Sequence, residues 1–385
     1  MAQVMLHSKY LVIGGGGYLG YRLGLLLLKT GETVTLFDVK EPDDLNPKFQ
    51  FIEGDVSLEE DVAKACSHAH HVFLVASYGM SGREQLNRRR IEAVNVQGTV
   101  NVINACRENS VKSLIYTSTT NVVFCGQPII NGNESLPYVP DSKHVDHYSR
   151  TKCIAEKLVL KANGTTGRRF VLHTCALRPA GIYGEGERRH LPRVVRNLER
   201  GLFAFTHGSD DSLVEFVHVD NLAQAHVLAA KALDENPSTV GGQPYFISDG
   251  CPVNNFEFFR PLIEGLGFKY PTIKLPLHLV YFFAFLTEMV HAVLSRCGYN
   301  FQPLLTRAEV YKTGVTHYFS IDKAKRELGY KPEHHSLEGV VEYFRTKGHG
   351  HTKKRRGGGA MFWLVNIALA LIAVLVLLSY LPLAK

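Results

Sequence analysis

Short apolar runs alternate with stretches of helical periodicity along the first half of the chain. The runs have the length and the β-branched and aromatic content of buried strands, and the stretches between them are long enough for helices. Strands joined through helices pair in parallel, so we expect an α/β fold with a doubly wound parallel sheet. The predicted strands are Lys9–Ile13, Thr33–Phe37, Gln50–Ile52, His71–Val75, Ser113–Thr117 and Phe170–Leu177, and the predicted helices are Tyr18–Lys29, Leu58–Cys66, Arg88–Arg107 and Tyr148–Lys161.

The alternation weakens from about Gly184 onward. This change indicates an added lobe rather than a second copy of the same unit. We therefore predict a sheet domain over residues 8–183 and a smaller C-terminal lobe, which would hold a substrate, over residues 184–346.

The longest apolar stretch lies at the C-terminal end. Residues 361–384 contain no charged side chain, and a basic, glycine-rich linker over residues 347–360 precedes them. A membrane span needs about 20 apolar residues, so this segment predicts a C-terminal transmembrane helix. Lys353, Lys354, Arg355 and Arg356 lie before it and only Lys385 lies after it, which predicts that the folded part stays on the cytosolic side.

A second apolar stretch covers residues 275–294, but it contains His278, Glu288 and His291. Ionisable side chains are costly in lipid, so we expect a helix that is buried or lies along the membrane surface. A second span, and therefore a multi-pass chain, stays open as the alternative.

Composition excludes two classes of protein. Hydrophobic residues make up 45% of the chain and charged residues 21%, which excludes wholesale disorder. Five of the seven excess positive charges lie in residues 349–385, so the remainder is too weakly basic for a nucleic-acid-binding surface. The seven cysteines are scattered without the spacing of a metal site, as expected in a reducing compartment.

Glycines follow the first predicted strand at positions 14, 17 and 20. A turn of this kind lets the backbone approach a pyrophosphate, and the helix that follows supplies free N–H groups and a positive dipole end. The spacing is G-x-x-G-x-x-G rather than G-x-G-x-x-G, but its position between a strand and a helix predicts a dinucleotide-binding Rossmann fold. The predicted cofactor contacts in this turn are Gly14, Gly17, Tyr18, Leu19 and Gly20.

Further cofactor contacts follow from the ends of the next strands. Asp38 ends the second strand, where a carboxylate accepts hydrogen bonds from ribose hydroxyls and repels a 2′-phosphate. We therefore favour NAD over NADP, although the nearby Lys40 keeps NADP open. Adenine contacts are predicted at Asp55 and Val56, and contacts where the cofactor crosses the sheet at Ala76 and Ser77.

Tyr148 and Lys152 are four residues apart on a predicted helix and therefore share one face. A free tyrosine titrates near ~10 and is a poor base at neutral pH. A neighbouring lysine stabilises the phenolate, so the pair can exchange a proton with a substrate hydroxyl. The same lysine can also hold the ribose of a nicotinamide cofactor.

Taken together, these motifs resemble the extended short-chain dehydrogenases/reductases, and among them the 3β-hydroxysteroid dehydrogenase/isomerase family with its membrane-bound 42E branch. The resemblance covers Lys9 to Phe344 and rests on residues 76–82, 116–119, 147–152, 177–179, 182–184, 217–220 and 328–332.

The resemblance implies roles for three residues. Tyr148 would be the catalytic acid/base, Lys152 its partner, and Thr119 the hydroxyl that orients the substrate. Many relatives carry serine at the position of Thr119, and Ser118 stays open as the alternative. Residues 177–183 would pass near the nicotinamide.

The sequence thus predicts a membrane-anchored, NAD-dependent oxidoreductase that interconverts a secondary alcohol and a ketone on a hydrophobic, steroid-like molecule, as in steroid biosynthesis. A sterol-4-carboxylate 3-dehydrogenase is the alternative enzyme, and a catalytically silent, membrane-tethered NAD-binding scaffold is the alternative of another class. We expect the endoplasmic reticulum membrane with a cytosolic catalytic domain, contact with membrane lipid, no metal and no nucleic acid. A homodimer stays open.

Overall fold

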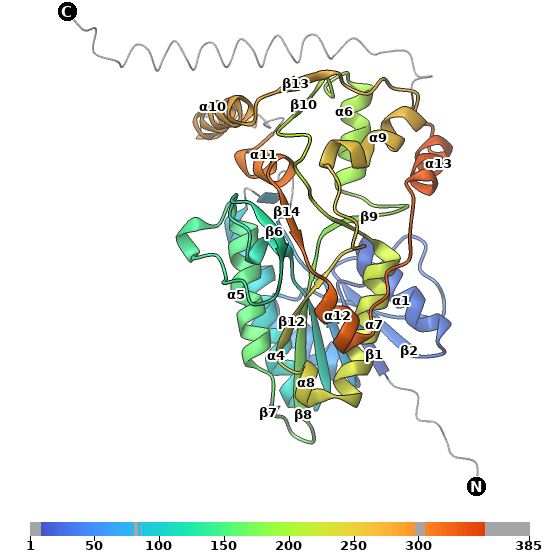
Figure 1. The fold of residues 1–385 in the computed structure, drawn as a ribbon. Coiled ribbons are helices and arrows are strands. Elements are labelled where there is room, and N and C mark those ends of the chain that lie inside the picture. The colour runs from blue at the N-terminus through green and yellow to red at the C-terminus, as the bar shows by residue number, and fades with distance from the viewer. Residues whose placement is uncertain (1–8, 81–83, 86, 297–304, 351–385) are drawn as a thin grey trace, which may run out of the picture.

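Seven parallel strands form the main sheet, in the order β12-β8-β5-β4-β1-β2-β3, and a short antiparallel strand, β7, pairs with β8 (Figure 1). The computed structural model describes residues 9–80, 84–85, 87–296 and 305–350. The strands of the sheet are β1 (Lys9–Ile13), β2 (Thr33–Asp38), β3 (Gln50–Glu53), β4 (His71–Leu74), β5 (Ser113–Thr117), β7 (Thr165–Thr166), β8 (Val171–Pro179) and β12 (Gln243–Ile247). The predicted doubly wound parallel sheet is confirmed.

Strand β1 lies at the point where the strand order reverses. It pairs with β2 on one side and β4 on the other, so that Val12 lies opposite Leu36 and Phe73. All three side chains are inaccessible to solvent, as expected for parallel strands that helices cover on both faces. A reversal of strand order opens a crevice at the carboxyl ends of the strands, and this is where such folds bind ligands.

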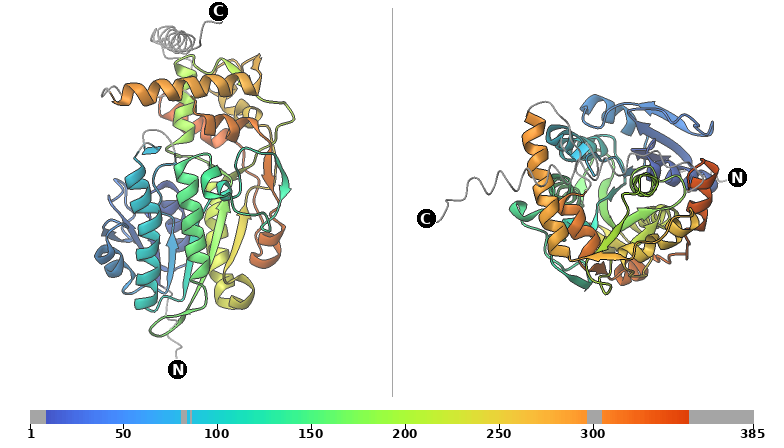
Figure 2. Two further views of the ribbon diagram at one scale, coloured as in Figure 1. Left: turned by 90° about the vertical axis from the view of Figure 1, so that its left-hand side faces the viewer. Right: turned by 90° about the horizontal axis from the view of Figure 1, so that it is seen from above.

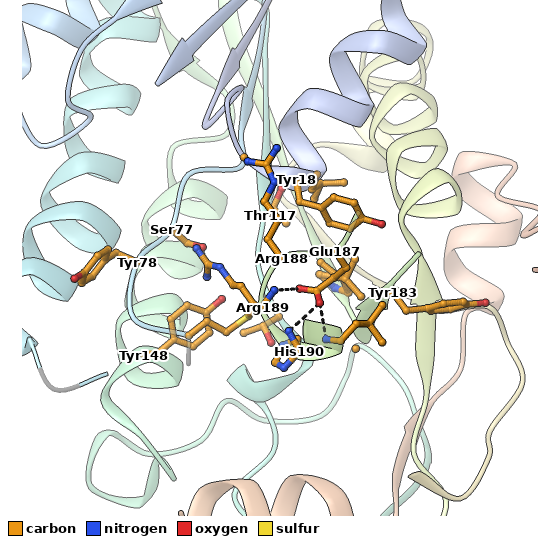
Figure 3. Close-up of a pocket in the computed structure, with 18 of the residues that line it drawn as sticks. Tyr18, Ser77, Tyr78, Thr117, Tyr148, Tyr183, Glu187, Arg188, Arg189 and His190 are labelled. Atoms are coloured by element: carbon orange, nitrogen blue, oxygen red, sulfur yellow. Dashed lines mark hydrogen bonds between the residues drawn. The ribbon is translucent and has the colours of Figure 1, made fainter. Parts of the chain in front are cut away.

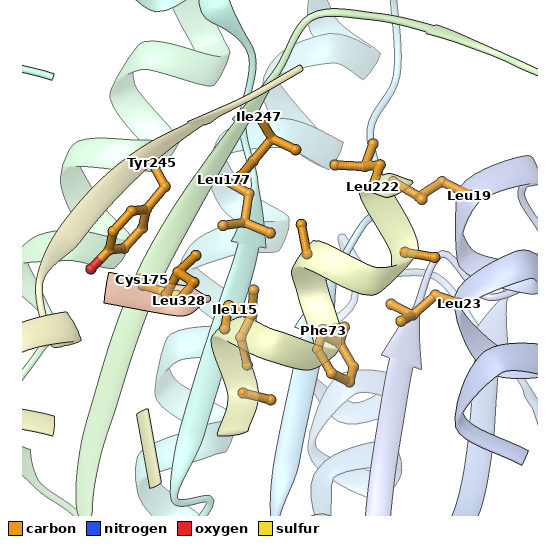
Figure 4. Close-up of a cluster of buried hydrophobic side chains, with 14 of the residues drawn as sticks. Leu19, Leu23, Phe73, Ile115, Cys175, Leu177, Leu222, Tyr245, Ile247 and Leu328 are labelled. Carbon is orange, nitrogen blue, oxygen red and sulfur yellow. The ribbon is translucent and has the colours of Figure 1, made fainter. Parts of the chain in front are cut away.

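Helices cover both faces of the sheet. Helices α1 (Tyr18–Lys29), α7 (Val219–Glu235), α8 (Pro237–Val240) and α12 (Asp322–Leu328) cover one face, and α2 (Glu59–Cys66), α4 (Gly98–Glu108) and α5 (His147–Lys161) cover the other. Helices α4 and α5 run side by side (Figure 2). The core under α1 and α7 includes Leu19, Leu23, Phe73, Ile115, Cys175, Leu177, Leu222, Tyr245, Ile247 and Leu328 (Figure 4).

The helix predicted at Arg88–Arg107 is interrupted by a π-helical turn. It consists of α3 (Arg88–Glu92), the turn η2 (Ala93–Gln97) and α4. The turn directs the buried Asn95 towards two neighbours: its side chain accepts a hydrogen bond from the Tyr78 N–H at 2.9 Å and donates one to the Thr151 hydroxyl at 3.0 Å. It therefore connects the segment after β4 with α5, and such turns are frequent near functional sites.

A smaller lobe lies over the carboxyl ends of the strands (Figure 1). It contains the pairs β9 (Gly181–Tyr183) with β11 (Phe216–His218) and β10 (Phe205–His207) with β13 (Ile273–Leu275). Its helices are α6 (His190–Glu199), α9 (Asn255–Gly265), α10 (Leu277–Arg296), α11 (Arg307–Gly314) and α13 (Glu338–Thr346). A further pair, β6 (Ile129–Gly132) with β14 (His317–Phe319), connects it to the segment after β5.

The predicted domain boundary at residue 183 is wrong for the sheet. After β11 the chain returns to the sheet domain, where α7 packs against α1 and β12 pairs with β8 from Gln243 opposite Cys175 to Ile247 opposite Pro179. β12 lies at the edge of the sheet and pairs with β8 on one side, while the Glu134 carboxylate accepts a hydrogen bond from the Phe246 N–H at 2.9 Å. Tyr245, Phe246 and Ile247 are almost completely buried.

Helix α10 coincides with the second apolar stretch. Among the described residues, no helix is long and apolar enough to cross a membrane. Val280, Ala284 and Leu286 of α10 are buried, whereas Phe282 and Phe283 are nearly half exposed. The predicted span over residues 361–384 lies outside the described residues.

Candidate active site

A cavity of about 1020 Å³ lies between the carboxyl ends of the strands and the lobe. All of the predicted site residues line this one cavity. They are Gly14, Gly17, Tyr18, Leu19, Gly20, Asp38, Asp55, Val56, Ala76, Ser77, Thr119, Tyr148 and Lys152. Figure 3 labels three of them, Tyr18, Ser77 and Tyr148.

The glycine turn admits no larger side chains. Gly14 has a φ of +92°, and a Cβ on it would lie 2.6 Å from the Ala76 backbone nitrogen. A Cβ on Gly20 would lie 2.1 Å from the Gly14 carbonyl oxygen, because helix α1 begins directly beside the end of β1. These two glycines therefore let the end of β1, the turn and the start of α1 pack against one another, which leaves the first N–H groups of α1 as the place where a pyrophosphate would bind.

Asp38 is oriented by the same turn. Its carboxylate accepts hydrogen bonds from the Gly16 N–H at 3.0 Å and the Val39 N–H at 2.8 Å. Burial raises the pKa of Asp38 above its ordinary value, against the effect of these hydrogen bonds. Lys40 pairs with Asp43 at 3.0 Å, so the cation nearest in sequence to Asp38 has another partner.

Asp55 is held by a residue whose role the sequence did not reveal. The Arg90 guanidinium lies 2.6 Å from the Asp55 carboxylate, and Ser57 donates a second hydrogen bond at 2.7 Å. Although burial acts in the other direction, these contacts lower the pKa of Asp55. Arg90 belongs to a run of three arginines that resembles a solvated helix face, so its pattern carried no signal.

Tyr148 and Lys152 both line the cavity and lie on the same face of helix α5, as predicted. Burial raises the pKa of Tyr148 to about 12, while the charge of Arg189 and a hydrogen bond with Ser77 act to lower it. Burial also lowers the pKa of Lys152 to about 7, partly offset by Glu156. The sequence suggested Lys152 as the cation beside the phenol, but in this structure Arg189 has that effect.

The Lys152 ammonium group contacts the end of β5. It donates a hydrogen bond to the Thr117 carbonyl oxygen and lies 4.2 Å from the centre of the Tyr116 ring. Both contacts come from the strand whose end carries the hydroxyl residues, so Lys152 holds α5 against that strand.

The hydroxyls that follow β5 differ in their availability. Ser118 is buried and donates its proton to the Glu156 carboxylate. The Thr119 hydroxyl oxygen accepts a hydrogen bond from the Asn121 N–H at 3.3 Å, which leaves its proton available for a ligand. The geometry therefore favours Thr119 over Ser118 as the substrate-orienting hydroxyl.

Glu156 and Arg178 form a buried ion pair behind the site. Their side chains are 0% and 1% exposed, and the shortest contact between them is 2.6 Å. Tyr138 donates a further hydrogen bond to Glu156 at 2.7 Å. Glu156 lies four residues after Lys152, and this spacing was the available signal for its position, but the sequence did not identify Arg178 as its partner.

The other half of the cavity is formed by the lobe. The Glu187 carboxylate accepts hydrogen bonds from the Arg189, His190 and Leu191 N–H groups at 2.7–2.8 Å and so fixes the start of α6. Figure 3 shows Arg188 and Arg189 extending from this loop into the pocket. The apolar lining residues are Leu191, Val194, Leu202, Phe203, Phe205, Val214, Phe216, Phe256, Phe259, Leu305 and Ala308.

Comparison with known proteins identifies the family. The profile of the 3-beta hydroxysteroid dehydrogenase/isomerase family matches residues 11–277. The chain belongs to this family. Short-chain dehydrogenase/reductase family 42E member 1 of Danio rerio is 59% identical over 382 residues, 97% of each chain. The Mus musculus sterol-4-alpha-carboxylate 3-dehydrogenase, decarboxylating, is 36% identical, over 84% of this chain and 87% of its own.

Solved structures show the same fold at low identity. The crystal structure of gox2253 has a TM-score of 0.70 at 23% identity and covers 90% of this chain and 100% of its own. UDP-glucose 4-epimerase of Thermus thermophilus, solved as a complex with NAD, has a TM-score of 0.64 at 20% identity, over 88% of this chain and 99% of its own. The predicted family and Rossmann fold are confirmed, and the prediction of a dehydrogenase is confirmed by how the relatives are named.

Proposed function

We propose that the chain is an NAD-dependent dehydrogenase that interconverts a secondary alcohol and a ketone on a hydrophobic, steroid-like molecule. One observation carries this proposal. Tyr148, Lys152 and Thr119 lie at the boundary between two halves of the cavity, of which one has the residues expected for a dinucleotide and the other is lined by apolar side chains. A catalytically silent scaffold would have no need of a phenol, an ammonium group and a hydroxyl at that junction.

The residues of the first half fit a dinucleotide. Gly14 and Gly20 let β1, the turn and α1 pack closely, which places the first N–H groups of α1 where a pyrophosphate would bind, and Asp38 offers a carboxylate to ribose hydroxyls. When bound, the nicotinamide ring supplies a hydride acceptor for the carbinol carbon. Thr119 orients the substrate hydroxyl, and Tyr148, as the phenolate, takes its proton. The positive charge of Arg189 stabilises that phenolate, and Lys152 fixes α5 against the end of β5. Reduction of a ketone uses the same groups in reverse.

The proposal is tested with the detergent-solubilised full chain. NAD or NADH is supplied with a panel of 3β-hydroxysteroids and 3-ketosteroids, and turnover is followed by NADH absorbance. We expect turnover with a member of the panel and a much lower rate in a Tyr148→Phe control. A protein that binds NAD but turns over no steroid, or that turns over a nucleotide sugar, would overturn the substrate assignment.

Replacing Asp38 with asparagine should weaken binding of NAD and improve the relative use of NADP. The change removes the negative charge that repels a 2′-phosphate and keeps a side chain of similar size. The measurement is the ratio of kcat/KM for the two cofactors. Glu41→Gln, which neutralises an exposed carboxylate lining the same cavity, is the control. An unchanged ratio in the Asp38 variant would remove Asp38 from the ribose site.

One observation favours a second candidate, a sterol-4-carboxylate 3-dehydrogenase. Arg189 extends into the cavity beside Tyr148, where it could bind a carboxylate next to the reacting hydroxyl (Figure 3). Arg189→Gln should then raise KM for a 4-carboxysterol much more than for a sterol without the acid. Equal KM changes for both substrates would favour the first candidate.

Membrane attachment also belongs to this proposal. It is supported by the apolar segment over residues 361–384 and by the exposed apolar side chains Leu279, Phe282, Phe283 and Met289 of α10. A steroid-like substrate dissolves in the bilayer, which suits an enzyme held at the endoplasmic reticulum with its catalytic part in the cytosol. The homodimer stays a prediction, which sedimentation of the solubilised protein would test.

Glycosylation in microsomes should report the topology. An acceptor site appended after Lys385 should become glycosylated, because a single span places that end in the lumen. The natural sequons at Asn133 and Asn163 should stay unmodified, since they lie in the folded part. Glycan on either of these two asparagines would contradict a cytosolic catalytic domain.

A further inference from the structure

Helix α11 of the lobe is attached to several parts of the molecule, including α10 through the ion pair of Arg307 with Glu288. Three further attachments bear on the site. Arg193 of α6 forms an ion pair with Glu309, whose carboxylate also accepts a hydrogen bond from the N-cap residue of α11. The Tyr311 ring packs so closely on the loop after β5 that a Cβ on Gly126 would lie 2.8 Å from it. The third attachment joins α11 to the helix that carries the proposed acid/base, through Lys312.

Lys312 and Asp146 form this third attachment. The Lys312 ammonium group lies 2.6 Å from one oxygen of the Asp146 carboxylate, and both side chains are largely buried. The other oxygen accepts the Ser149 N–H at 2.6 Å, so Asp146 is the N-cap of α5. Burial acts to raise the pKa of Asp146, but Lys312 and the cap hydrogen bonds hold it below its ordinary value.

Asp146 is the N-cap of α5, and Tyr148 lies two residues later, in the first turn of the helix. An N-cap side chain satisfies a backbone N–H that has no partner inside the helix, and it keeps the first turn from fraying. The position of the phenol therefore depends on this cap. Lys312 itself lines the cavity, together with Ala308, Glu309 and Thr313. The same side chain therefore forms part of the cavity wall and contacts the N-cap of α5.

We propose that Lys312 is a positioning residue, which fixes the Tyr148 hydroxyl through Asp146 and so couples the substrate lobe to the acid/base. This inference rests on the proposed function in one respect, that Tyr148 exchanges the proton. The ion pair joins residues 166 positions apart in the sequence, so the packing of the lobe against the sheet domain decides whether the cap is complete.

Two variants of the full chain test the coupling, with a control. Lys312→Met keeps the length of the stem and removes the charge, and it should lower kcat about 10- to 100-fold with little change in KM for NAD. Lys312→Arg should restore most of the rate, because it keeps a cation in reach of Asp146. Lys231→Met, which removes a lysine from an exposed pair on α7, should change neither.

Amide hydrogen exchange gives a readout that needs no substrate. In Lys312→Met, the Ser149 and Arg150 amides should exchange faster than in the natural protein, and in Lys312→Arg they should not. Asp146→Asn keeps an acceptor for the cap but loses the charge, so adding Lys312→Met to it should cause little further change in kcat or exchange.

Unchanged exchange in Lys312→Met, or strictly additive effects in the double variant, would overturn the coupling. A uniform rise in exchange throughout the molecule would show a structural role instead and would also overturn it. Failure of the natural protein to turn over any steroid would refute the proposed function alone, because the exchange measurement still decides about Lys312.

Discussion

Tyr148→Phe should lower turnover about 10²- to 10⁴-fold while leaving NAD binding intact. Phenylalanine keeps the ring, which is only 5% exposed, so the packing of α5 against its neighbours persists. The variant loses the group that exchanges a proton with the substrate hydroxyl. The measurements are kcat with the best steroid of the panel and the Kd for NAD by calorimetry.

Tyr78→Phe is the matched control, because Tyr78 lines the same cavity and has no proposed role in proton exchange. It should keep turnover close to that of the natural protein. If Tyr148→Phe kept full turnover, another group would have to exchange the proton. If it lost NAD binding as well, the effect would be structural rather than catalytic.

Much of the sheet could be predicted because its signals are local. Strands β1 and β5 and helix α1 have the predicted bounds, since each is a compact apolar or periodic run beside a glycine or polar turn. Strand β12 was missed. Gln243 and Pro244 weaken its apolar pattern, and its partner β8 lies more than 60 residues earlier, so the pairing depends on contacts that no local pattern encodes.

The site divides in the same way. The glycine turn and the Tyr148–Lys152 pair depend on spacings within one element, and the structure brings them to one cavity. Arg189 and Lys312 come from the lobe, and their approach to α5 follows from its packing against the sheet domain. Burial, which sets the direction of the pKa shifts of Tyr148 and Lys152, also follows from tertiary packing rather than from any local pattern.

Glu156→Gln should destabilise the protein by about 3–5 kcal/mol. The change keeps the shape of the side chain but removes the charge that compensates Arg178, which is 1% exposed. Glutamine can still accept hydrogen bonds from Ser118 and Tyr138. The free energy that these bonds contribute is smaller than the cost of burying a guanidinium without a counter-charge. The measurement is the free energy of unfolding, obtained by urea titration of the detergent-solubilised protein.

Removing the second charge separates the ion pair from simple packing. The double variant Glu156→Gln with Arg178→Met has no buried charge left to compensate, so it should recover part of the lost stability despite carrying two changes. Glu235→Gln, in the exposed pair with Lys231, should have little effect on unfolding because water screens that pair. A double variant that is less stable than Glu156→Gln alone would mean that Arg178 contributes mainly by packing over the Tyr138 and Phe246 rings, which lie 5.2 and 5.1 Å from it.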